Sequence, residues 1–171
     1  MDHFFAHVVG ESFRNDDGSD RQAIIPRCRL GELLVLEPEP DNPHDINAMR
    51  VLTQRGEQVG YLERDFAGQV VSRSARGWGF HALVAGIGRA GGSGLYGMAL
   101  LIVVENDGAT DGEVAGYGRR VLARDREVAG DDTAAAPHRG NARASHSDRL
   151  VTGIAVAIIG LAVAVALILL R

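Results

Sequence analysis

The sequence contains no lysine and only one cysteine, Cys28, among its 171 residues. A single cysteine excludes an internal disulfide framework and is typical of a protein kept in a reducing compartment. All 18 basic residues are arginines, and 22 acidic residues outnumber them, so the formal net charge is −4. The strong basic excess that marks many nucleic-acid-binding proteins is therefore missing from the chain as a whole.

The N-terminus also lacks the features of a secretion signal. Residues 1–7, Met-Asp-His-Phe-Phe-Ala-His, contain no lysine or arginine and no long apolar run. A cleaved signal peptide needs both of these features. We therefore expect the folded part of the chain to remain in the cytoplasm.

Patterns that carry catalysis or bind metals are lacking as well. Ser12, Ser72 and Cys28 have no histidine and carboxylate at a spacing typical of an activated nucleophile. There is no P-loop and no Cys/His cluster, and His3 and His7, although spaced like helical zinc ligands, lie in a segment expected to be extended. We expect a protein that is not an enzyme, with no cofactor and no bound metal.

Two further motifs have simpler interpretations than the sites they resemble. Gly86 to Gly91 has the spacing G-x-G-x-x-G, but more glycines and an apolar β-like run follow it. A dinucleotide-binding loop must open a helix, so this segment is interpreted as a hairpin loop. Residues 41–47 resemble the start of a calcium loop, but Ile46 stands where that loop requires glycine, so no calcium site is expected.

The most apolar part of the chain is Leu150 to Leu170, which holds 21 residues without a charge. As a helix it would be roughly 31 Å long, which matches the hydrocarbon core of a bilayer. Arg139, Arg143 and Arg149 precede it, whereas Arg171 alone follows it, so the N-terminal side is expected to be cytoplasmic. The sequence thus predicts a single-pass, tail-anchored membrane protein with the lipid bilayer as a partner.

Four small residues share one face of this predicted helix: Gly153, Ala157, Gly160 and Ala164. Such a face allows two helices to approach closely in lipid, which would give a weak homodimer. Seven of the 21 residues are alanine or glycine, however, so chance is the simpler explanation.

Residues 107–149 are rich in Asp, Arg, Gly and Ala and contain one aromatic residue, Tyr117. No apolar period persists there, so the segment is predicted to be a disordered linker. Val114 to Val128 could form a fluctuating helix, which Gly116 and Gly118 would weaken.

Residues 1–106 are predicted to fold as a single domain of mainly β structure. Apolar runs bounded by turn residues predict strands at 4–9, 33–36, 48–53, 58–62, 80–87 and 96–104. Two helices are expected, one near 22–28 and one over 64–74. Five or six short strands with two short helices indicate a small OB-like or curled β-barrel.

The most specific segment runs from Glu37 to Val51 and contains Asn42-Pro43-His44-Asp45-Ile46-Asn47-Ala48. It is followed by Gly60-Tyr61-Leu62, and Val8 to Phe13 stand at the start of the domain. Together these elements resemble the HIRAN domain, whose members carry an N-P-aromatic-D-x-N-A-x-x-V core and a G-aromatic-L element. The resemblance spans about residues 7–104.

The resemblance implies an OB-like barrel that captures the 3′ end of single-stranded DNA. By position, Phe13 would stack on a base, and His44 and Asp45 would lie beside the terminal nucleotide. Asp45 would accept a hydrogen bond from the 3′-hydroxyl, Tyr61 would line the same pocket, and Arg64 would contact phosphate. These roles suit the chemistry, because aromatic faces hold any base and arginine offers a forked donor to phosphate.

Two functions from different classes remain open at this point. The first is a membrane-tethered module that binds single-stranded nucleic-acid ends. The second is an interaction module that presents its pocket to a protein or peptide at the cytoplasmic face of the membrane. The acidic balance of residues 1–106, with ten Arg against 14 Asp and Glu, favours the second.

Overall fold

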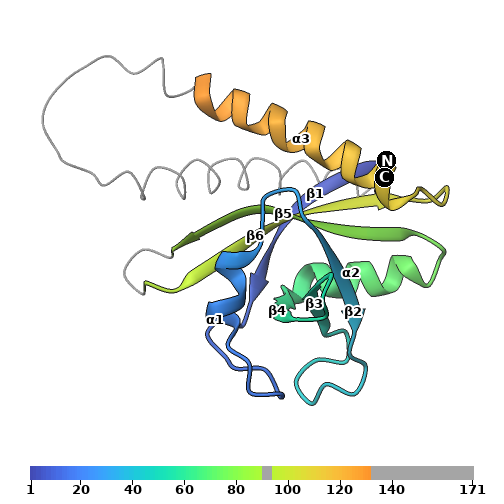
Figure 1. Ribbon diagram of the computed structural model, residues 1–171. Helices are drawn as coiled ribbons and strands as arrows, with labels where there is room; N and C mark the ends of the chain where they lie inside the picture. Colours follow the sequence, from blue (N-terminus) through green and yellow to red (C-terminus); the bar gives the residue numbers. More distant parts are fainter. Residues whose placement is uncertain (90–93, 132–171) are drawn as a thin grey trace, which may run out of the picture.

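The computed structural model describes residues 1–89 and 94–131, which form a closed β-barrel with helices on its outside (Figure 1). Every pair of neighbouring strands is antiparallel, and the order around the barrel is β1-β4-β3-β2-β5-β6. The strands are β1 (Asp2–Val9), β2 (Leu33–Pro38), β3 (Met49–Thr53), β4 (Gln58–Leu62), β5 (Gly79–Arg89) and β6 (Tyr96–Glu105). The helices are α1 (Arg21–Ile24), the 3₁₀ turn η1 (Ile25–Arg27), α2 (Arg64–Ser74) and α3 (Asp111–Asp131). The predicted barrel, its six strands and its two short helices are confirmed.

The barrel interior is built by alternating side chains. In β3, Met49, Val51 and Thr53 are buried and the residues between them are partly exposed. In β6, by contrast, every residue from Met98 to Glu105 is buried. One face of β6 supplies Leu100 and Ile102 to the barrel core, and the other must be covered from outside.

The backbone conformation at Gly60 explains why the G-aromatic-L element begins with a glycine. Its φ of +153° is rarely adopted by residues with a side chain. A Cβ at this position would run into Val8 Cγ1 and lie 2.6 Å from the carbonyl oxygen of Val9. The glycine therefore lets β1 and β4 approach closely and places Tyr61 opposite Val9.

The two short helices form where the sequence predicts them. Asp20 caps α1 by accepting a hydrogen bond from the backbone N–H of Gln22, and Pro26 lies in the first turn of η1. Helix α2 buries Ala67 and Val70, and its Phe66 ring stacks on Phe4 of β1 at a centroid distance of 4.9 Å. This packing fixes α2 directly after β4.

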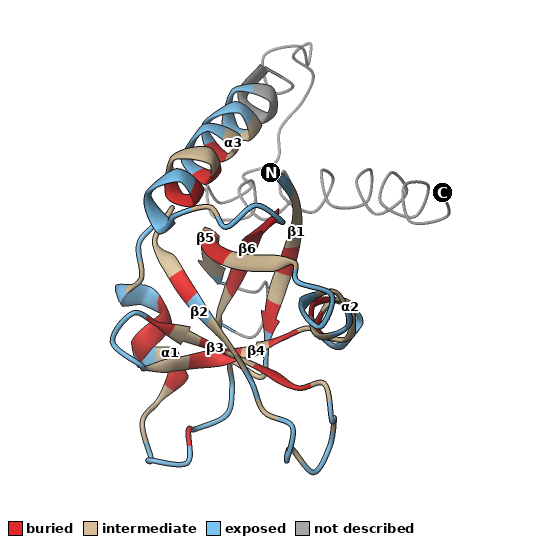
Figure 2. Ribbon diagram, turned by 90° about the vertical axis from the view of Figure 1, so that its right-hand side faces the viewer, coloured by how far each residue is buried: buried red, intermediate tan, exposed pale blue. Residues whose placement is uncertain are grey.

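Helix α3 replaces part of the expected linker, where the sequence indicated no more than a fluctuating helix over 114–128. It buries Val114 and Leu122 against Leu83, Leu101 and Val103, which form the outer face of β5 and β6 (Figure 2). The prediction of disorder was therefore wrong for residues 111–131, because the second apolar face of β6 gives this helix a surface to pack on. The remaining linker residues, 132–149, lie outside the described residues.

Gly118 lets α3 approach the barrel closely, since a Cβ there would lie 2.7 Å from Leu83 Cδ2. Tyr117 joins the helix to β1, because its hydroxyl lies 2.8 Å from Nδ1 of His3. Burial lowers the pKa of His3, which favours the neutral ring whose nitrogen can accept the tyrosine hydrogen. A glycine expected to weaken the helix thus stands where the helix packs on Leu83 of the barrel.

The predicted transmembrane helix at 150–170, including Gly153, Ala157, Gly160 and Ala164, lies outside the described residues. Within 1–89 and 94–131, no helix has the length and apolar character needed to cross a membrane. The glycine-rich segment at 86–91 begins inside β5, which extends to Arg89, and β6 starts at Tyr96. The interpretation as a hairpin loop was therefore wrong for residues 86–89, which pair with β6, and residues 90–91 lie outside the described residues.

Candidate nucleic-acid interface

Two long loops lie at one end of the barrel, and α3 lies at the other (Figures 1 and 2). One loop, residues 10–20, joins β1 to α1, and the second, residues 39–48, joins β2 to β3. All five residues proposed from the HIRAN resemblance come from these loops, from β4 or from the first residue of α2. We call this region the end site.

The loop 39–48 is organised by its own polar side chains. Asn42 Oδ1 accepts hydrogen bonds from the backbone N–H groups of His44 and Asp45, at 2.9 and 3.2 Å. Asp45 Oδ1 in turn accepts one from the N–H of Asn47 at 2.9 Å. These side chains hold the turn, as Asn and Asp commonly do, and leave the His44 side chain exposed.

Arg64 ties the start of α2 to this loop. Its Nε donates to Asp45 Oδ2 at 3.0 Å, and its Nη2 donates to the carbonyl oxygen of His44 at 2.9 Å. The Asp45 side chain is 19% exposed and that of Arg64 is 71% exposed. The structure therefore brings His44, Asp45 and Arg64 together, with the carboxylate held in place and the guanidinium facing solvent.

Phe13 and Tyr61 meet at the other loop, around Gly10. A Cβ built on Gly10 would lie 3.6 Å from Phe13 Cδ2 and 3.8 Å from Tyr61 Cδ2, so the two rings flank this glycine. Gly10 has φ +76°, a conformation that favours glycine in tight turns. Phe13 is 66% exposed, which leaves most of its ring available to a ligand.

Arg21 is a residue of the end site that the sequence did not reveal. It is only 5% exposed, and its guanidinium lies over the Tyr61 ring at 5.2 Å from the centroid. Nε donates to Asn15 Oδ1 at 2.5 Å and Nη1 donates to the carbonyl oxygen of Gly10 at 2.8 Å. Within residues 1–89 and 94–131, Arg21 forms no ion pair with a carboxylate. Its buried positive charge is therefore contacted by neutral groups, namely an amide oxygen, a carbonyl oxygen and the Tyr61 ring.

Arg50 is a second residue that the sequence did not indicate. It lies directly opposite Tyr61 in the β3–β4 pair and opposite Glu37 in the β2–β3 pair. Its Nη2 binds Glu37 Oε2 at 3.0 Å, and its Nε is buried without a hydrogen-bond partner among the described residues. Residues opposite one another share a face of the sheet, so this arginine stands next to Tyr61 on the outside of the barrel.

The two halves of the end site are continuous through β4, because Tyr61 lies three residues before Arg64. Three guanidinium groups, those of Arg21, Arg50 and Arg64, gather there with two carboxylates, those of Glu37 and Asp45. The two loops carry six further carboxylates, those of Glu11, Asp16, Asp17, Asp20, Glu39 and Asp41, so these arginines stand in an acidic surround. Sequence reasoning counted charge along the chain, whereas the fold concentrates three arginines at one end.

Comparison with known proteins finds similarity to the HIRAN domain in the N-terminal part of this chain. The family model described as HIRAN domain matches residues 1–85. The crystal structure of the HIRAN domain of human HLTF is similar at 23% identity and a TM-score of 0.44, covering 60% of this chain and 74% of that chain. A crystal structure of a protein from Lactobacillus plantarum is similar at 23% identity and a TM-score of 0.44, covering 57% of this chain and 90% of that one. No curated protein matches the sequence.

Proposed function

We propose that this HIRAN-type domain is a non-catalytic module that binds the free 3′ end of a single nucleic-acid strand. The observation that carries the proposal is the end site itself. An immobilised carboxylate, an exposed guanidinium and two aromatic rings lie at one end of the barrel, beside the buried Arg21. Each group matches a different part of a strand terminus.

Asp45 is the group that would distinguish an end from an interior nucleotide. Its carboxylate accepts from Asn47 and Arg64, and each oxygen keeps a lone pair that can accept from a hydroxyl. A phosphate at the same place would be repelled by the negative charge. Arg64 Nη1 makes no hydrogen bond within residues 1–89 and 94–131, so it can contact the preceding phosphate while Nε stays paired with Asp45.

Phe13 and Tyr61 would hold the bases without regard to sequence. Stacking on an aromatic side chain contributes about 1–3 kcal/mol per base. The Arg21 charge beneath the Tyr61 ring adds attraction for the nearby phosphates, which normally dominate affinity for nucleic acids.

A titration of the full-length chain with 5′-labelled oligonucleotides tests the proposal. We expect binding of a strand with a free 3′-hydroxyl, and at least about tenfold weaker binding of the same strand with a 3′-phosphate, from the loss of one charged hydrogen bond. Asp45→Asn should remove most of this discrimination, and Arg64→Ala should weaken both strands. Arg55→Ala removes the same charge from an exposed position in the β3–β4 turn and serves as the matched control. Equal affinity for the two strands would refute the assignment of Asp45.

A second candidate function is supported by the exposed apolar side chains of the end site. Ile46 is 75% exposed and Phe13 is 66% exposed, and the loops that carry them lie at the same end of the barrel. A protein or peptide partner with an apolar side chain could contact both loops. Capture of a partner that persists after nuclease treatment and is lost in Ile46→Asp would favour this function over nucleic-acid binding.

We also propose that the domain is tethered to a membrane through residues 150–170. The uncharged sequence of 21 residues supports this, and the preceding arginines favour a cytoplasmic domain. Deletion of 150–171 should release the protein from the membrane fraction. Retention of the deletion variant in the membrane fraction would contradict the tether. ATP turnover by the purified protein would contradict a non-catalytic module.

A further inference from the structure

A hollow of about 620 Å³ runs along the outer face of α2, next to the end site. Its lining consists of Asp65, Gly68, Gln69, Ser72 and Arg73 from the helix, and of Arg76 and Trp78 from the segment that follows it. Asp65 is the one acidic residue in the lining, whereas Arg73 and Arg76 are both basic. The hollow therefore combines positive charge with an aromatic ring, as single-strand binding grooves do.

Arg73 is held in a fixed orientation in this hollow. Its guanidinium lies over the Trp78 ring at 4.5 Å from the centroid and over the Phe80 ring at 5.8 Å. Within the described residues it forms no ion pair with a carboxylate. The aromatic rings position the cation, and its hydrogen-bonding edge stays available to an anion.

The hollow borders the end site. Asp65, in its lining, directly follows Arg64, which binds Asp45. Gly68, also in the lining, faces the loop 39–48, because a Cβ there would lie 3.8 Å from Asn47 Nδ2. Asn47 is in turn hydrogen-bonded to Asp45 through its backbone N–H.

We propose that this hollow is a second subsite for the same nucleic-acid strand, which binds the nucleotides on the 5′ side of the captured end. The inference rests on the proposed function, since it extends the strand from the end site. From Arg64 to Ser74 the helix rises roughly 15 Å, enough for a few nucleotides of an extended strand. Arg73 and Arg76 bind phosphates along this path, and Trp78 provides the apolar surface that a base covers.

Trp78 is the only tryptophan of the chain, so its fluorescence reports on this subsite alone. Unlabelled oligothymidylates of increasing length, each with a free 3′-hydroxyl, are titrated into the full-length protein. A dinucleotide is expected to fill the end site without changing the Trp78 emission. Strands of six or more nucleotides are expected to quench the emission and to bind roughly tenfold more tightly, as one additional stacked base and its phosphate would provide.

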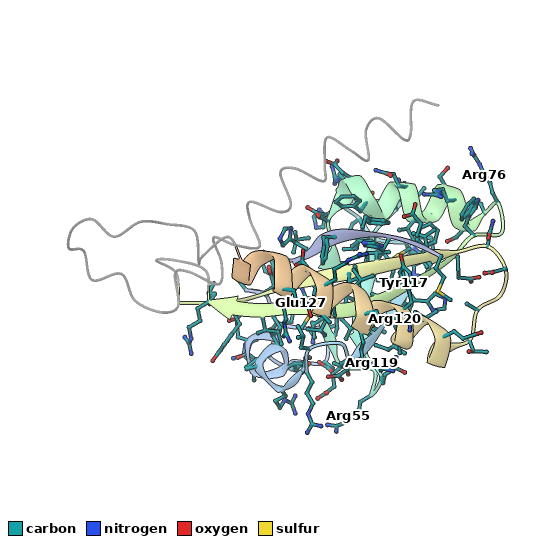
Figure 3. All side chains as sticks on the ribbon, turned by 90° about the horizontal axis from the view of Figure 1, so that it is seen from above. Arg55, Arg76, Tyr117, Arg119, Arg120 and Glu127 are labelled. Carbon is teal, nitrogen blue, oxygen red and sulfur yellow. The ribbon has the colours of Figure 1, made fainter. Side chains whose placement is uncertain are left out.

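Two matched pairs of variants locate the effect. Gly68→Leu places a side chain in the hollow, whereas Gly68→Ala adds only a Cβ at ordinary contact distance from Asn47 and is the control. Arg76→Ala and Arg55→Ala remove the same charge, and Figure 3 shows these two arginines projecting from opposite sides of the molecule. Gly68→Leu and Arg76→Ala should both lower affinity for the long strand. Arg76→Ala should leave affinity for the dinucleotide unchanged and should reduce the salt slope of binding by about 0.7.

The results separate the inference from the proposed function. If long and short strands bind equally well and Trp78 emission does not respond, the second subsite is refuted while the end site stands. If Arg55→Ala has the same effect as Arg76→Ala, the length dependence reflects general charge and the inference is again overturned. If no oligonucleotide binds, the proposed function fails and the subsite fails with it. Far-UV circular dichroism of Gly68→Leu, together with Arg73→Gln as a second variant, distinguishes blocked binding from misfolding.

Discussion

Replacement of the two glycines in the middle of α3 by alanine tests how the helix packs on the barrel. Gly116 and Gly118 lie on the same helix, and in an exposed helix either change to alanine would stabilise the protein by about 1 kcal/mol through higher helix propensity. Their surroundings differ, however. A Cβ at Gly116 would meet only the end of the Arg120 side chain, at 3.6 Å from Nη1.

At Gly118 the added Cβ would meet the barrel itself. It would lie 2.7 Å from Cδ2 and 3.1 Å from Cδ1 of Leu83. Leu83 is fully buried among Leu101, Val103 and Val114, so it has little room to move. Overpacking of this kind costs about 1–3 kcal/mol, so Gly118→Ala should be neutral to destabilising by about 2 kcal/mol once the gain in propensity is included.

Urea unfolding followed by far-UV circular dichroism measures both variants against the wild-type chain. We expect Gly116→Ala to be more stable than Gly118→Ala by about 1–3 kcal/mol, because the propensity gain is common to both and only the overpacking differs. Leu83→Val should partly relieve the clash, so the double variant should lose less stability than the two single changes together. If Gly118→Ala proves as stable as Gly116→Ala, α3 does not pack on β5 as closely as the structure indicates.

Three further predictions concern single positions in the barrel. Gly60→Ala should lower the free energy of unfolding by about 2–5 kcal/mol, measured by urea denaturation, because it combines an unfavourable φ with a clash against β1. Hydrogen bonds from backbone N–H groups, that of Ala109 first, lower the pKa of Glu105 below 4.5. The stabilisation that they give is complete above pH 4.5 and is lost as the pH falls through the lowered pKa. Glu105→Gln should flatten this acid dependence of the urea midpoint, and an unchanged profile would exclude the mechanism. Burial raises the pKa of the Cys28 thiol from 9.0 to about 11. Because the thiolate is the reactive form, Cys28 in the native protein should be alkylated roughly a hundredfold more slowly than in urea. Equal rates would show that the thiol is exposed.

The strands and short helices were predictable because their signals are local. The run Leu33 to Leu36 before two prolines and the period of Phe66, Val70 and Val71 each indicate one element without knowledge of the rest. Helix α3 was not predictable in the same way. Its apolar residues are few, and what stabilises it is the outer face of β6. The continuous apolar run of β6 is typical of a strand covered on both faces, but it does not indicate which segment supplies the cover.

The residues of the end site likewise divide into those that the sequence could predict and those that it could not. His44, Asp45 and Arg64 were found through a motif, and the structure brings them into contact. Arg21 and Arg50 belong to no motif in the sequence, and each reaches Tyr61 only because the barrel closes β1 onto β4 and places β4 beside β3. Proximity of this kind depends on strand register, which a count of charges along the chain does not contain.

The hydrogen bonds within loop 39–48 also have a thermodynamic consequence. Because Asn42 and Asp45 already fix the backbone of this turn, its residues have little conformational freedom left to lose when a ligand arrives. Immobilising a disordered loop of this length would oppose association by about 1–2 kcal/mol per residue. A preformed turn avoids that penalty, so association at this end of the barrel should be rapid and should proceed without a slow rearrangement step.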